Sequence, residues 1–121
     1  MEDRIKNLIQ LLEKKTRNND AIWTRTSGDN EFKIDINNST ITTDMWSIED
    51  LIYYEFVILN ENGDQVERIV VGDNDPFSNE FQIVTNFYEA VKNNYFKVDE
   101  TIESILKELN SGIKLGGNKK K

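Results

Sequence analysis

The sequence predicts an α+β domain, a two-layer sandwich in which a five-stranded antiparallel meander carries helices on one face. Three observations predict this fold. Apolar residues recur at helical spacing in residues 3–16, 77–93 and 99–110. Runs of β-branched and aromatic residues fill the stretch between the first and second of these segments, and short turn sequences separate the runs. The order helix, five strands, two helices favours one sheet with its helices on a single face.

The first helix is expected over residues 3–16. Its apolar stripe has the spacing i, i+3, i+4, i+7, and Leu11 widens it: Ile5, Leu8, Ile9 and Leu12. An acidic start and a basic end, with Lys14 and Lys15, complement the helix dipole.

Three strands are expected next, over residues 21–26, 31–36 and 39–43. In the second, Phe32, Ile34 and Ile36 alternate with charged residues, which is typical of a half-buried strand. Asn37-Asn38 suits a two-residue turn that places Ile41 opposite Ile34. Residues 44–50 then form a polar connection, the only long one between strands.

The central hairpin pairs residues 51–59 with residues 65–71 around Asn62-Gly63, which we expect to be the tightest turn of the sheet. Its register stays open, because a two-residue turn and a bulged three-residue turn give different pairs. Glu55 marks the wetter face, which it shares with Tyr53 and Val57. The alternate residues then face the core: Tyr54, Phe56 and Ile58.

The last two helices are expected over residues 77–93, capped by Asp75 with Pro76 in the first turn, and over residues 99–110, capped by Asp99. The final helix has a clean apolar stripe: Ile102, Ile105, Leu106 and Leu109. We expect Leu106 and Ile34 to be core residues. Residues 1–113 form the single domain, and residues 114–121 form a flexible basic tail.

Composition excludes several chemistries. The chain of 121 residues has no cysteine and no histidine, so it lacks a thiolate nucleophile, an imidazole base and the usual zinc ligands. We therefore expect no catalytic residues, no metal and no cofactor. No apolar run reaches the roughly 18 residues of a membrane span, and the N-terminus lacks the apolar segment of a signal peptide. The expected location is the cytoplasm.

Charge indicates the kind of partner. The net charge is −7, and because Lys119, Lys120 and Lys121 contribute +3, residues 1–118 carry −10. An acidic body repels phosphate backbones, which argues against direct binding of nucleic acid. It favours a basic protein partner and speeds encounter with one.

The leading functional expectation is a small, acidic, non-enzymatic protein that binds a macromolecular partner, in its most concrete form an inhibitor or immunity-type protein. The asparagine- and isoleucine-rich composition is typical of AT-rich bacterial or phage genomes. Trp46 is the expected aromatic anchor, since Trp is a common hot-spot residue. The expected surrounding carboxylates are Asp44, Glu49 and Asp50 beside it, with Glu61, Asp64 and Glu67 on the hairpin. A competing account has Trp46 plugging the open end of the sheet.

Two alternatives stay open. Glu31-Phe32-Lys33 matches the Glu-x-Lys element of restriction-type nuclease cores, with Asp20 as the upstream carboxylate of a metal-dependent enzyme. The simpler interpretation is that Glu31 and Lys33 lie on the solvent face of an amphipathic strand. The other alternative is a small-ligand sensor domain with a pocket between the sheet and the helices.

Overall fold

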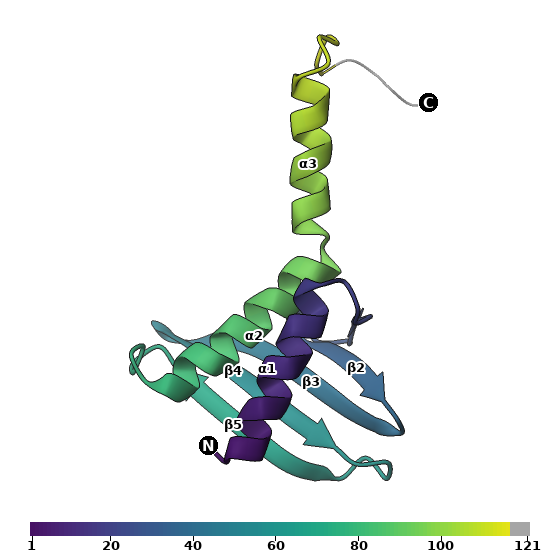
Figure 1. Cartoon of the computed structure of the whole chain (residues 1–121). Coiled ribbons are helices and arrows are strands. Elements are labelled where there is room, and N and C mark those ends of the chain that lie inside the picture. Colours follow the sequence, from purple (N-terminus) through teal and green to yellow (C-terminus); the bar gives the residue numbers. More distant parts are fainter. Residues whose placement is uncertain (117–121) are drawn as a thin grey trace.

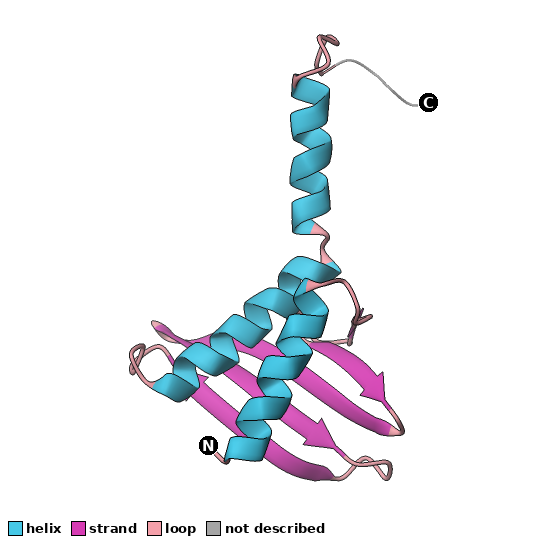
Figure 2. Ribbon diagram, in the orientation of Figure 1, coloured by secondary structure: helices cyan, strands magenta, loops and turns pink. Residues whose placement is uncertain are grey.

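The structure, a computed structural model, describes residues 1–116, and it confirms the predicted α+β class (Figures 1 and 2). The helices are α1 (Asp3–Arg17), α2 (Asn79–Tyr95) and α3 (Val98–Leu109). The strands are β1 (Thr24–Arg25), β2 (Phe32–Ile36), β3 (Ser39–Ile48), β4 (Leu51–Leu59) and β5 (Gln65–Gly72). They form one antiparallel sheet in the order β1-β2-β3-β4-β5, as predicted.

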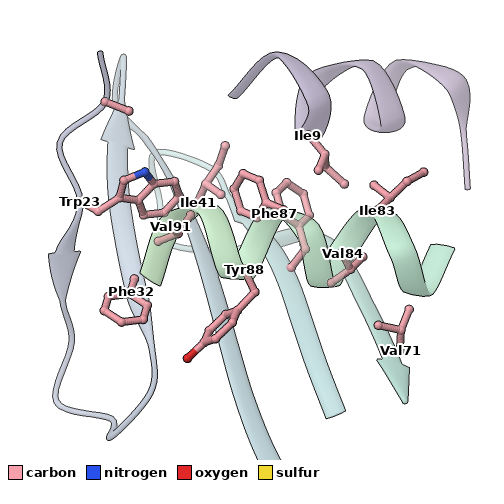
Figure 3. Close-up of a cluster of buried hydrophobic side chains, with 12 residues drawn as sticks. Ile9, Trp23, Phe32, Ile41, Val71, Ile83, Val84, Phe87, Tyr88 and Val91 are labelled. Atoms are coloured by element: carbon pink, nitrogen blue, oxygen red, sulfur yellow. The ribbon is translucent and has the colours of Figure 1, made fainter. Parts of the chain in front are cut away.

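Helices α1 and α2 lie side by side on one face of the sheet (Figure 1). The wide apolar face of α2 contacts both the sheet and α1. Phe87 has no exposed surface and packs edge-to-face against Trp23, at 5.6 Å between ring centroids, and against Phe56 of β4, at 5.4 Å. Figure 3 shows Trp23 and Phe87 among the buried side chains between the helices and the strands. The main hydrophobic core cluster therefore lies on this side of the sheet.

A buried polar chain joins α1 to the segment that enters the sheet. The indole Nε1 of Trp23 donates to Thr16 Oγ1 at 3.0 Å, and the Thr16 hydroxyl donates to the Leu12 carbonyl at 2.8 Å. Thr16 is fully buried, so the hydroxyl satisfies the indole where water cannot reach it. These hydrogen bonds fix the path of the polypeptide as it enters β1. Strand β1 is shorter than the predicted strand over residues 21–26.

The register on the helix-covered face follows the predicted pattern. Ile34 pairs with Ile41 across a two-residue turn in which Asn37 and Asn38 take φ values of 56° and 88°. Asparagine tolerates this left-handed region better than most residues. Phe56 is fully buried toward the helices, and the alternate residues of β4, including Glu55, occupy the opposite face, as expected.

The predicted polar connection over residues 44–50 was wrong. Strand β3 continues to Ile48, and only Glu49 and Asp50 connect it to β4. The prediction that Asn62-Gly63 is the tightest turn was also wrong, because it lies in a five-residue connection that ends in a bulge near Leu59. Gly63 does take the expected positive φ, 82°. The end of β3 was missed because the two faces of that strand do not differ clearly in polarity.

The helix boundaries at the C-terminal side also differ from the prediction. Helix α2 begins three residues after Pro76, where Ser78 Oγ accepts a hydrogen bond from the Phe81 N–H at 3.0 Å. Asp99 lies inside the first turn of α3 rather than capping it. Of the predicted tail over residues 114–121, residues 117–121 lie outside the described part of the chain.

The position of α3 contradicts the expectation that all three helices cover the sheet. It extends away from the two-layer body (Figure 1), and none of its residues is buried. Leu106, expected in the core, is 46% exposed. Ile34 is partly buried against the core, as expected. Only Phe96 and Lys97 separate α2 from α3, and Lys97 takes a left-handed φ of 55° that redirects the chain.

Replacement of Phe87 by alanine tests where the core lies. Phe87→Ala should lower the free energy of unfolding by about 3–5 kcal/mol, because it removes a fully buried ring that two other rings contact. Urea denaturation followed by circular dichroism measures this. Phe77→Ala is the matched control: Phe77 is 88% exposed, so its loss should cost under about 0.5 kcal/mol. Equal effects of the two substitutions would contradict the assignment of the core.

Candidate functional site

The sheet face turned away from α1 and α2 is the open face, and it carries an aromatic pair. Trp46 of β3 and Tyr53 of β4 are cross-strand neighbours. Their rings stack with centroids 5.9 Å apart and an interplanar angle of 21°. Both side chains are half-buried. Such a pair presents a large rigid surface with few torsions to order, as aromatic anchors of interfaces do.

An apolar pair and an acidic turn lie beyond the aromatic pair. Ile48 pairs with Leu51 at the end of the β3–β4 ladder, on the same face as Trp46. Ile48 is more than half exposed. Glu49 and Asp50 then form the turn and are both exposed. This end of the open face therefore combines uncovered apolar surface with two carboxylates.

On the other side of the aromatic pair, three carboxylates form an acidic row. Asp44 and Glu55 are directly paired across β3 and β4, and Glu31 joins them so that one oxygen of each lies within 4.8 Å of the others. Glu31 accepts a hydrogen bond from Thr26 Oγ1 at 2.7 Å, and Glu55 accepts one from Arg68 Nε at 2.5 Å. Three oxygen donors suit a hard cation, and the ion pair with Arg68 shows that the row accepts a guanidinium.

Asp44 is the member of the acidic row whose negative charge is disfavoured by its surroundings. Partial burial raises the pKa of its carboxyl above the ordinary value, and the charges of Glu31 and Glu55 raise it further. A hydrogen bond from the Met45 N–H to Asp44 Oδ1, at 2.7 Å, acts in the opposite direction. Like charges directly opposite in a sheet are destabilising. An incoming cation would relieve this repulsion.

The structure brings together some of the predicted binding residues and separates others. Trp46 and Asp44 share the open face, with Glu49 and Asp50 at the adjacent turn. The remaining predicted carboxylates do not join them. Glu61 and Asp64 lie beyond the far end of β4, roughly 25 Å along that strand from the β3–β4 turn. Glu67 pairs with Ile58, which faces the helices, so it lies on the other face.

Tyr53 and Glu55 contribute to the open face but were not among the predicted binding residues. The sequence pattern assigned both residues to the wetter face of β4. Their roles follow from the cross-strand pairs with Trp46 and Asp44, which exist only because β3 continues to Ile48. A longer predicted β3, paired in register with β4, would have indicated that Tyr53 and Glu55 lie beside Trp46 and Asp44.

The competing account, in which Trp46 plugs the open end of the sheet, was wrong. Phe87 and Val91, which would surround a plug, are buried on the helix-covered face. Trp46 lies on the opposite face, against Tyr53.

The nuclease residues are not brought together. Glu31 joins the acidic row on the open face, whereas Asp20 lines a groove on the helix-covered side. The Lys33 ammonium lies 4.0 Å from Asp35 on its own strand. The sequence pattern Glu-x-Lys is thus accounted for by the solvent face of β2, and Asp20 does not complete it.

The helix-covered side of the sheet carries a hollow. It is a groove of about 1060 Å³ between α1 and strands β2 to β4. Its apolar lining is contributed by Leu8, Leu11, Leu12, Ile34, Ile36, Ile41 and Ile58. It follows α1 from Arg4 to Asn18, so it is elongated rather than enclosed. The small-ligand alternative placed its pocket in this region.

Comparison with known proteins gives no match: no family model, no curated sequence and no solved structure resembles this chain. Among the residues that the structure describes, no helix has the length and apolar character needed to cross a membrane.

Neutralising Asp44 tests whether repulsion among the carboxylates of the acidic row destabilises the folded protein. Asp44→Asn keeps an acceptor for the Met45 N–H and removes one charge, so at neutral pH it should raise the free energy of unfolding by about 0.2–1 kcal/mol. Because the folded-state pKa is raised, the native protein loses stability as the pH rises through that pKa. The stability gain of Asp44→Asn should therefore vanish below the ordinary pKa of 3.8, where Asp44 is protonated in both the folded and the unfolded state. Thermal melts at neutral and acidic pH measure it.

Asp50→Asn is the control for Asp44→Asn, because Asp50 is an exposed residue of the β3–β4 turn. It should shift the melting temperature much less at neutral pH. A gain for Asp44→Asn that persisted unchanged in acid would show that charge is not its cause.

Proposed function

We propose that this chain is a non-enzymatic binding protein whose open face engages a basic protein partner. The observation that carries the proposal is the stacked pair of Trp46 and Tyr53, bordered on one side by the acidic row and on the other by Glu49 and Asp50. In its most concrete form the protein is an acidic inhibitor or immunity-type protein of the cytoplasm.

The aromatic pair supplies the affinity. Hot spots are usually Trp, Tyr or Arg residues near the centre of an interface, surrounded by groups that exclude water. Ile48 and Leu51 extend the apolar surface beside Trp46 and Tyr53. No helix covers this surface within the described part of the chain, so a partner's apolar side chain can reach it directly.

The carboxylates supply the selectivity for basic groups. A Lys or Arg placed between Asp44 and Glu31 would replace like-charge repulsion with attraction, as Arg68 already does for Glu55. The net charge of −7 adds a long-range attraction that speeds encounter with a basic surface. The partner therefore has an apolar group flanked by Lys or Arg.

Peptide selection provides the first test. Peptides selected by display against the immobilised protein should be enriched in Lys and Arg flanking an apolar residue. Trp46→Ala should weaken binding of a selected peptide by at least about 2 kcal/mol, roughly 30-fold in Kd, as expected for a hot-spot anchor. Isothermal titration calorimetry measures the loss. Folding should lose only about 0.5–1.5 kcal/mol, the size of an aromatic pair.

Val66→Ala serves as the control for Trp46→Ala. Val66 is an exposed apolar residue beside the bulge at the far end of β4, and its loss should leave Kd unchanged. Peptides without basic residues, or contacts that NMR shift mapping places on the helices, would contradict the proposal.

Charge reversal at the β3–β4 turn provides the second test. Glu49→Lys together with Asp50→Lys should reduce the association rate and its salt dependence, because rim charges act mainly on encounter. The dissociation rate should change little. Stopped-flow kinetics at two ionic strengths measure both rates. The same reversal at Glu61 and Asp64, which lie beyond the other end of β4, is the matched control and should act more weakly. An effect confined to the dissociation rate would contradict a rim position for the turn.

A further inference from the structure

The groove beside α1 is a vacant helix position on the covered face of the sheet. Its walls are α1 on one side and strands β2 to β4 on the other, and its lining is mainly apolar. Leu11 is 57% exposed and Ile36 is 42% exposed. Helix α1 has 15 residues, about 22 Å at 1.5 Å per residue, so the groove has room for a helix laid alongside it.

Helix α3 has an apolar stripe that nothing in the described chain covers, so it could fill an apolar groove of this kind. Ile102, Ile105, Leu106 and Leu109 have helical spacing, and each is about half exposed. Ile113 and Leu115 extend the exposed apolar surface beyond the helix. A stripe of this kind on a soluble helix normally faces a packing partner. With 12 residues, α3 is about 18 Å long, which fits within the length of α1.

We propose that α3 of one copy docks into the α1 groove of a second copy, and that the two copies do so reciprocally in a symmetric dimer. This surface is distinct from the open face, so the dimer leaves the proposed partner site accessible. In such an isologous arrangement the same pair of surfaces is used twice.

Charge complementarity favours this pairing over the pairing of two α3 helices. Helix α3 carries a net charge of −3, from Asp99, Glu100, Glu103 and Glu108 against Lys107. Helix α1 carries +3 within a chain of net charge −7, from Arg4, Lys6, Lys14, Lys15 and Arg17 against Asp3 and Glu13. The groove itself is lined by three of these cations, Arg4, Lys14 and Lys15, against one carboxylate, Asp20. Lys14 and Lys15 form no ion pair with the described residues. Two α3 helices, by contrast, would repel each other.

The short link between α2 and α3 rules out docking within one copy. Phe96 and Lys97 are the only residues between the helices, and two extended residues reach at most about 7 Å. Helix α2 packs against α1, and the groove borders α1 and the strands. An occupant would therefore lie two helix spacings from α2, about 16–20 Å. A second copy can supply α3 without unwinding α2.

Complementation between two defective chains tests the proposal. Leu106→Lys places a charge on the α3 stripe, and Leu11→Asp places one in the groove. Sedimentation equilibrium should show a concentration-dependent dimer for the unaltered chain, and at least a tenfold increase in Kd for each variant. An equimolar mixture of the two variants should form a heterodimer, because the intact α3 of one fits the intact groove of the other.

The control for both substitutions is Val66→Asp, which alters a residue as exposed as Leu11 but on strand β5. It should dimerise like the unaltered chain. Circular dichroism spectra and melting temperatures of monomeric variants establish that each one folds. A monomer at all concentrations up to about 1 mM, or variants that fold but do not complement each other, would overturn the proposal. Dimerisation lost in Leu106→Lys alone would instead identify pairing between α3 helices and also overturn it.

Discussion

The burial of Phe87 between two layers is the contact on which the rest of this structure depends. Its ring meets Trp23 and Phe56 edge-to-face, so one side chain of α2 joins the segment that enters the sheet to a central strand. Because α2 contacts the sheet and α1 together, α1 is held mainly through α2. The free energy of folding is thus concentrated on one face of the sheet, where the largest side chains are buried.

This one-sided arrangement leaves two apolar surfaces of the two-layer body without cover in the described chain. Two helices span only part of the sheet, so a groove remains along the free flank of α1. Among the described residues no helix lies on the opposite face, which carries Trp46 and Tyr53. Exposed apolar surface costs free energy in water, and when polar residues border it, it commonly marks an interaction site. Both uncovered surfaces are the basis of the binding proposals made above.

The two surfaces differ in the sign of the charge beside them. Carboxylates border the aromatic pair on the open face, and Asp44 is raised in pKa by its surroundings. Cations border the groove, although the chain as a whole is acidic. Under the two proposals, the opposite charges would direct a basic partner to the open face and the acidic α3 of a second copy to the groove.

The sequence alone determined the fold class, the order of the elements, the turn at Asn37-Asn38 and the inward faces of β2 and β4, because these follow from local periodicity and turn chemistry. It could not place α3, since the spacing of Ile102 and Leu106 shows that an apolar stripe exists but not what covers it. It also missed the end of β3, where Asp44 and Trp46 alternate with Thr43 and Met45 and neither face is clearly polar. The acidic row arises from cross-strand pairing of residues distant in sequence, which only the tertiary register decides.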